Sequence, residues 1–155
     1  MPPSQTTRDL TSEGAMRAFL VVELLRSTGE REFPAQLASV FFWIAAHEGC
    51  KQEDLTAECN ISPSSVSRSV TWLGPKHRLE HRSGLHLVMR KQDPDNHRAW
   101  RLYLTQKGKV FTNLLDNTAK TSLSNSIGMA VQAKKSLLTY DKESTVQNQD
   151  LGTGA

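Results

Sequence analysis

The stretch ISPSSVSRSVTWLGP, residues 61–75, decides the fold. Ser62 is a good N-cap and Pro63 suits the first helical position, where its missing N–H costs nothing. The glycine and proline at 74–75 end the helix. Its apolar residues recur at helical spacing and form one face: Val66, Val70 and Leu73. The stretch therefore predicts a short helix whose other faces carry serines, a threonine and an arginine.

The segments on either side extend this helix into a larger motif. Residues 52–58, around Leu55, predict a second short helix that precedes it across a tight turn. Leu85 to Arg90 and Trp100 to Leu104 alternate apolar and polar residues with period two, and the tip between them is rich in turn residues. Together they predict a helix-turn-helix followed by a β-hairpin, which is a winged helix-turn-helix.

The rest of the chain predicts helices. Residues 12–26 have a broad apolar face, and Pro34 fits the first turn of a second helix. Thr105 is an N-cap for a later helix, and helical periodicity continues to about Tyr140. The apolar residues of the second and later helices are Leu37, Val40, Phe41, Ile44, Ala45, Val110, Phe111, Leu114 and Leu115. We expect a mainly α fold with a small β-hairpin wing.

The domain organisation follows from composition. Residues 1–11 are expected to be a flexible arm, 12–140 a single DNA-binding and dimerisation domain, and 141–155 a disordered polar tail. The longest apolar run is seven residues, Val40 to Ala46, which is too short to span a bilayer. Residues 1–10 lack the apolar stretch of a secretory signal, and two cysteines cannot build a disulfide framework. We therefore expect a cytoplasmic protein without a membrane partner.

Charge is concentrated in one third of the chain. The whole chain has a net charge of +3, but residues 60–110 contain ten basic and three acidic residues, which gives +7. The remainder carries −4. A localised basic patch is the footprint of phosphate binding, because neutralising a polyanion releases its counterions. Nucleic acid is the expected partner, and a merely solvated basic surface is the alternative.

Specific residues in this window suit DNA recognition. Ser64, Ser65 and Ser67 are short enough to let the helix backbone approach a major groove. Arg68 is suited to a bidentate contact with guanine or phosphate, and the alternative is a surface pair with an acidic neighbour. Arg98, beside His97 at the wing tip, can reach a phosphate or a minor groove, and the alternative is a solvated loop charge.

These residues also carry a resemblance. Asp54-Leu55, Ile61 to Arg68, Asp93 to Arg98 and Leu104 to Gly108 resemble the MarR family of bacterial transcription regulators, over roughly residues 12–120. The resemblance implies a homodimer, built from N- and C-terminal helices, that binds pseudo-palindromic operators in double-stranded DNA. It also implies recognition helices in successive major grooves and Arg98 in a minor groove.

The expected sites follow from the residues and the resemblance together. We expect a repressor with no cofactor and no catalytic activity, and a small-molecule effector is a further candidate partner. The expected DNA-binding residues are Ser62, Ser64, Ser65, Ser67, Arg68, Thr71, Arg90, Lys91, His97, Arg98 and Arg101. The expected dimerisation residues are Met16, Phe19, Leu20, Leu123, Ile127 and Val131.

Four features leave alternatives open. A winged helix can also bind a protein partner, such as polymerase or replication machinery. His77-Arg-Leu-Glu80-His81 matches an inverted zinc-peptidase signature, which makes His77, Glu80 and His81 weak metal candidates for a hydrolase or a zinc sensor, but the signature needs a helix. Cys50 and Cys59 are either small buried residues or redox sensors, and Phe42 and Trp43 either pack in the core or line a ligand pocket.

Overall fold

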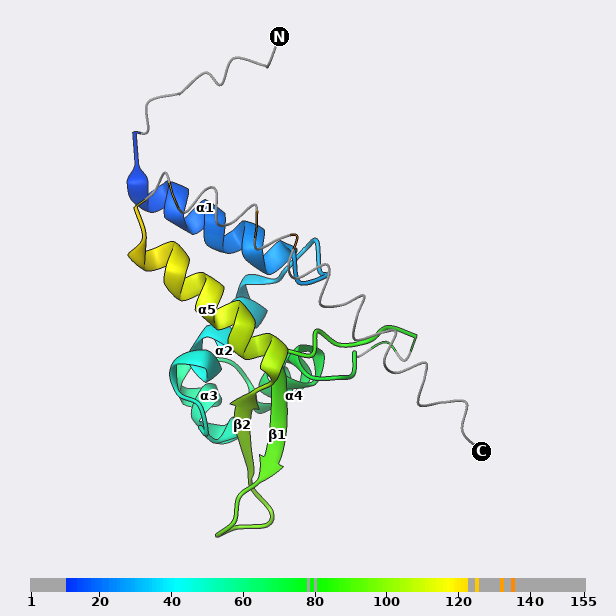
Figure 1. The fold of residues 1–155 in the computed structure, drawn as a ribbon. Helices are drawn as coiled ribbons and strands as arrows, with labels where there is room; N and C mark the ends of the chain where they lie inside the picture. The colour runs from blue at the N-terminus through cyan, green and yellow to red at the C-terminus, as the bar shows by residue number, and fades with distance from the viewer. Residues whose placement is uncertain are drawn as a thin grey trace, which may run out of the picture.

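The computed structural model describes residues 11–77, 79, 81–122, 125, 132 and 135. Figure 1 shows α1 and α5 side by side and the β1–β2 hairpin extending away from them. No helix within the described residues is long and apolar enough to cross a membrane. The expected mainly α fold with a β-hairpin wing is confirmed. Its elements are α1 (Glu13–Arg26), α2 (Ala35–Ala46), α3 (Gln52–Glu58), α4 (Pro63–Leu73), β1 (Val88–Gln92), β2 (Trp100–Leu104) and α5 (Gln106–Lys120).

Side-chain caps start three of these helices. The Ser12 hydroxyl oxygen accepts a hydrogen bond from the amide of Ala15 at the start of α1. Ser62 accepts from the amide of Ser65 at the start of α4, and Thr105 accepts from the amide of Gly108 at the start of α5. Each cap satisfies one N–H group that the first turn leaves without a helical partner. The predicted helix starts are therefore correct to within one residue.

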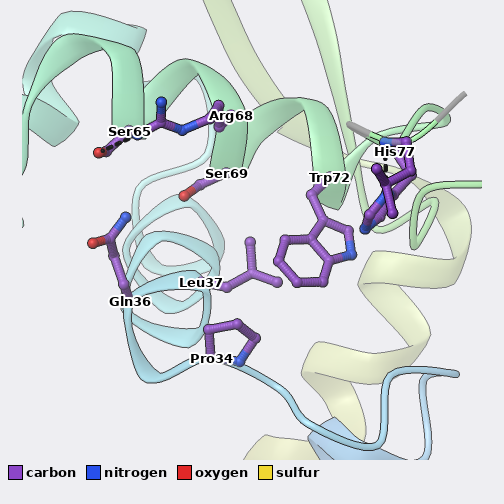
Figure 2. Close-up of a pocket in the computed structure, with 9 residues that line it drawn as sticks. Pro34, Gln36, Leu37, Ser65, Arg68, Ser69, Trp72 and His77 are labelled. Atoms are coloured by element: carbon purple, nitrogen blue, oxygen red, sulfur yellow. Dashed lines mark hydrogen bonds between the residues drawn. The ribbon is translucent and has the colours of Figure 1, made fainter.

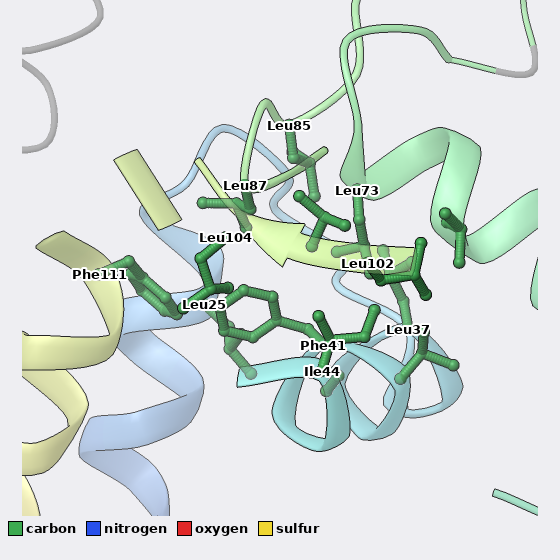
Figure 3. Packing of buried hydrophobic residues seen from close by; sticks show 14 of the residues in the cluster. Leu25, Leu37, Phe41, Ile44, Leu73, Leu85, Leu87, Leu102, Leu104 and Phe111 are labelled. Atoms are coloured by element: carbon green, nitrogen blue, oxygen red, sulfur yellow. The ribbon is translucent and has the colours of Figure 1, made fainter. Parts of the chain in front are cut away.

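One core joins the helix-turn-helix to α5. Phe41 of α2 packs its ring 5.5 Å from that of Phe111 of α5, and both side chains are fully buried. Figure 3 shows Ile44, Leu73 and Leu102 converging on the same cluster from α2, α4 and β2. Burying each such side chain contributes about 1.5–3 kcal/mol. The core therefore fixes the wing and α4 relative to α5.

The first strand begins later than its sequence pattern predicts. Leu85 and Leu87 are both buried, and His86 between them has φ +55°. The amides of Leu85 and Leu87 bond to the carbonyls of Trp72 and Leu73 at the end of α4. The apparent alternation is therefore a loop that covers the end of α4, and ladder pairing starts at Val88, opposite Leu104.

A break in the predicted helical run follows α5, and the described residues beyond it, Asn125, Gln132 and Lys135, are helical. Thr121 follows α5 with ψ 157°, which is extended backbone. Arg17 of α1 covers this end, because its guanidinium donates to the carbonyls of Thr118 and Thr121 at 2.8 and 3.2 Å. The predicted helical periodicity towards Tyr140 lies largely outside the described residues, as do the predicted tail and residues 1–10 of the predicted arm.

Candidate nucleic-acid interface

Helix α4 presents a polar face to solvent. Ser64, Arg68 and Thr71 lie at i, i+4 and i+7 on the side opposite the buried Val66 and Val70. At its N-terminus, the hydroxyl of Ser62 lies 3.1 Å from that of Ser64 and 3.0 Å from that of Ser65. Ser67 lies beside Thr71, on the edge of this face next to the wing.

Arg68 is exposed and available for an outside partner. Its guanidinium donates to the Ser65 hydroxyl at 3.0 Å, which orients the side chain along α4. Within the described part of the chain it forms no ion pair with an acidic neighbour. Among the described residues, the arrangement favours an Arg68 side chain that is open to a partner over one paired with a carboxylate.

Arg90 links the wing to α4. From β1 its guanidinium donates to the Thr71 hydroxyl at 3.2 Å and to the Ser67 carbonyl at 3.4 Å. Burial lowers the pKa of this guanidinium from its ordinary value. Arg90 therefore places a positive charge at the border between wing and helix. Lys91, on the opposite face of the hairpin, lies 5.0 Å from the centre of the Tyr103 ring.

Arg101, an expected DNA contact that could also simply flank the hairpin, is held by partners within the chain. Its Nε donates to Asp93 Oδ2 at 2.8 Å and its Nη1 donates to the Gly49 carbonyl at 3.1 Å. The guanidinium is thus committed to an ion pair and to the loop between α2 and α3. We assign Arg101 to holding the wing in place.

Asp93 organises the tip of the wing. Its carboxylate accepts from the amide of Asp95 at 2.9 Å and from Arg101, and these hydrogen bonds hold its pKa below the ordinary value. The Asn96 side chain then accepts from the amide of Arg98 at 3.1 Å. His97 and Arg98 are both exposed at this folded tip. Sequence reasoning missed the buried role of Asp93, although the residue belongs to the motif that carries the resemblance.

A crevice beside the wing contains further residues that the sequence reasoning missed. It has a volume of about 410 Å³ and lies between α3, the start of α4 and the wing. Lys51 and Trp100 line it together with Arg98, and the Trp100 side chain is 43% exposed. Lys51 gives no signal in the sequence because it lies outside the basic window of residues 60–110 and is soon followed by Glu53 and Asp54. Trp100 was read only as a strand residue.

A cavity of about 420 Å³ lies on the other side of α4, against the start of α2. Figure 2 shows Leu37 and Trp72 projecting into the space between these helices, with Arg68 and Ser65 at one end and His77 at the other. The described lining residues include no carboxylate. Phe42 and Trp43, the predicted pocket candidates, are absent from this lining and pack against the core instead.

The expected dimerisation residues divide into three groups. Phe19 of α1 is 54% exposed, and Met16 is partly exposed. Leu20 is 4% exposed and packs within the chain, so it is not free for a partner in this structure. Val22 adds an exposed apolar side chain that was not predicted. Leu123, Ile127 and Val131 lie outside the described residues.

The metal signature lacks the helix that it requires. Lys76 and Ser83 pair as an isolated antiparallel bridge, and His77 Nδ1 accepts from the amide of Leu79 at 3.0 Å. His81 lies in a turn, and Glu80 is outside the described residues. In the described residues no group of three metal-binding side chains occurs. His77 and His81 therefore do not share a helical face here.

The two cysteines pack against the core. Burial, with the nearby Asp54 carboxylate, raises the pKa of Cys50 to about 11. Burial also raises the pKa of Cys59. Both thiols are therefore protonated at neutral pH, which disfavours the thiolate that a redox sensor needs.

Comparisons with known proteins give similarity of fold. The sequence matches no protein-family model and no curated protein. Among solved structures, Streptococcus pneumoniae FabT in complex with DNA has a TM-score of 0.53 at 18% identity, covering 85% of this chain and 92% of that one. The S. aureus MepR–DNA complex has a TM-score of 0.52 at 14% identity, covering 83% and 94%.

A third solved structure gives the fold its family name. The MarR family transcription regulator SP03579 has a TM-score of 0.50 at 18% identity, and the match covers 91% of this chain and 85% of that one. All three matches span most of both chains. The chain has the winged-helix fold of the MarR-family transcription regulators.

Proposed function

We propose that this chain is a sequence-specific transcription regulator that binds double-stranded DNA in the cytoplasm as a homodimer. It acts as a repressor on pseudo-palindromic operators. The observation that carries the proposal is the joining of two polar surfaces: the Ser64–Arg68–Thr71 face of α4 and, directly beside it, Arg90 of the wing. A helix with small polar side chains flanked by fixed positive charge fits a major groove and its phosphates.

The charge distribution supports the same partner. Residues 60–110, which contain α4 and the wing, carry +7, and the remainder of the chain carries −4. Arg68, Arg98 and Lys91 are exposed within this module. FabT and MepR, which share the fold, were solved in complex with DNA. We assign the contacts to Ser62, Ser64, Ser65, Ser67, Arg68, Thr71, Arg90, Lys91, His97 and Arg98.

The homodimer rests on the apolar surface of α1. Phe19 and Val22 are about half exposed, which leaves large apolar side chains in water in the single chain. A second copy would remove this surface from water and stabilise the pair.

The cavity between α2 and α4 supports a small-molecule effector as a further partner. Its volume of about 420 Å³ falls in the range of ordinary ligand sites, and Arg68 lines both this cavity and the proposed DNA surface. A ligand that engaged Arg68 would compete with DNA. No reaction is assigned to the chain, because the His77 segment lacks the helical geometry of the hydrolase signature.

The test begins with selection of genomic fragments by the purified protein, followed by titration of a selected duplex and a scrambled duplex at several salt concentrations. We expect the selected duplex to bind at least a hundredfold more tightly, with log Kd rising steeply with log salt. Light scattering should give twice the chain mass. Binding without sequence preference or salt dependence would overturn the proposal and favour a protein partner.

A further inference from the structure

The residues that line the crevice between α3 and the wing are suited to bind one sugar-phosphate unit of the DNA backbone. It is lined by the exposed indole of Trp100, the cationic side chains of Lys51 and Arg98, and the polar side chains of Gln52 and Thr56. In the described residues neither Lys51 nor Arg98 forms an ion pair. An exposed indole that shares a crevice with two cationic side chains is unusual for a solvated surface.

The walls of this crevice are fixed to one another. Lys51 pairs with Arg101 as an isolated antiparallel bridge, directly beside Trp100. The amide of Gly49 donates to the Leu102 carbonyl at 2.7 Å, and the amide of Leu102 donates to the Cys50 carbonyl at 2.9 Å. The loop before α3 is thus attached to β2 by backbone hydrogen bonds. The separation between Lys51 and the wing is therefore set before any ligand arrives.

We propose that this crevice holds a deoxyribose-phosphate of duplex DNA, with the sugar against Trp100 and the phosphate between Lys51 and Arg98. The indole has an apolar face for the sugar and an N–H that can donate to a phosphate oxygen. The two cations supply charge-assisted hydrogen bonds to the phosphate. This inference rests on the proposed function and adds two residues, Lys51 and Trp100, to its binding surface.

The position of the crevice agrees with this occupant. Pro63, the first residue of α4, forms part of its wall, so it opens beside the end of the helix that would enter the major groove. Arg98 approaches it from the tip loop on the other side. A backbone lying between helix and wing would pass this point. Glu53 also lines the crevice, and its carboxylate opposes a phosphate.

Because Lys51 and Glu53 carry opposite charges, removing each charge should change DNA affinity in opposite directions. Lys51→Gln should weaken binding to selected and scrambled duplexes alike and lower the slope of log Kd against log salt by about one. Glu53→Gln should strengthen binding to both duplexes. Lys120→Gln, at the exposed end of α5, is the matched control and should change neither quantity. An unchanged slope for Lys51→Gln, or weaker binding for Glu53→Gln, would overturn the proposal.

Trp100 is tested by a double-mutant cycle, read by fluorescence anisotropy. Trp100→Ala should weaken duplex binding roughly threefold to tenfold with an unchanged salt slope. Its effect should be smaller in the Lys51→Gln background, because both side chains hold the same unit. Trp100→Phe, which keeps a ring, should recover part of the loss. Strictly additive effects, or a loss confined to single-stranded oligonucleotides, would overturn the proposal.

The same titrations separate the two proposals. If the parent protein binds no duplex, the proposed function fails. If the parent binds and Arg68→Ala weakens it while the Lys51 and Trp100 variants behave as parent, the proposed function stands and the crevice proposal alone fails.

Discussion

Arg101 and Asp93 form an ion pair across the wing, with Arg101 Nε 2.8 Å from Asp93 Oδ2, and the Asp93 carboxylate is almost completely buried. The same guanidinium reaches the Gly49 carbonyl. One arginine therefore fastens the tip loop to the helix-turn-helix. Arg101, which the sequence offers as a DNA contact, therefore also holds the wing against the loop between α2 and α3.

This ion pair predicts a pH dependence of stability. The pKa of Asp93 lies below its ordinary value of 3.8, so its contribution is complete at neutral pH and is lost as pH falls below 3.8 through the native value. Urea unfolding should show that the free energy of unfolding falls less between pH 7 and pH 3 for Asp93→Asn than for the parent. An identical loss in both proteins would contradict the role of Asp93.

Arg68→Ala tests the recognition helix. Binding to the selected duplex should weaken by about 1–3 kcal/mol, with relaxed discrimination at one base pair. Arg31→Ala, an exposed arginine between α1 and α2, is the matched control and should bind as the parent does. Anisotropy titrations against single-base variants of the duplex measure both effects. Parent-like affinity for Arg68→Ala would remove that residue from the interface.

Arg90→Ala tests the link between wing and helix. Because Arg90 bonds to both Thr71 and Ser67, its loss should weaken duplex binding more than Lys91→Ala does, and it should also speed hydrogen exchange in β1. Arg90→Lys should restore little, since an ammonium lacks the forked geometry of the guanidinium. Equal effects of the Arg90 and Lys91 substitutions would show that only charge matters here.

Arg17→Ala tests the junction between α1 and α5. The side chain is 28% exposed and donates to carbonyls at the end of α5, and hydrogen bonds from a charged group contribute about 1.5–3 kcal/mol to stability. Arg26→Ala removes an ion pair with Glu23 and a single hydrogen bond to the Arg31 carbonyl, both local to the end of α1, and should cost less than Arg17→Ala. Thermal unfolding compares the two. A Tm for Arg17→Ala equal to that of Arg26→Ala would contradict this junction.

Gly108→Ala tests the contact between α5 and the loop before β1. A Cβ at Gly108 would collide with the Leu87 carbonyl oxygen, so the backbone must shift, at about 1–3 kcal/mol. Gly14→Ala is the control, because a Cβ there meets nothing and removes a flexible glycine from α1. Urea unfolding should show destabilisation for the first and none for the second.

The residues explain how far the sequence predicts this structure. A helix start depends on a side chain and an amide three residues away. The starts at Ser12, Ser62 and Thr105 can therefore be predicted from the local sequence. The start of β1 depends instead on where Leu85 and Leu87 find partners, and these are carbonyls of α4 more than ten residues earlier. Alternation alone cannot distinguish such a loop from a strand.

The same distinction applies to the candidate site. Arg68 lies on α4, and the helical spacing of the apolar residues of α4 predicts which face is buried. The exposure of Arg68 on the other face therefore follows from the sequence. Arg101 has the same side chain, but its fate depends on Asp93 and Gly49, which only the folded hairpin brings near it. The use of Lys51 and Trp100 likewise depends on long-range pairing between β2 and the loop before α3.

The hydrogen bonds from Arg17 to the end of α5 have a consequence for the spacing of the operator half-sites. In a homodimer that associates through α1, this side chain would fix the direction of α5, and the Phe41–Phe111 contact would then fix the position of α2, against which α4 packs. The distance between the two recognition helices would then be set by packing inside each chain. Such a dimer would accept one half-site spacing, and an operator lengthened by a few base pairs would lose one of its two major-groove contacts.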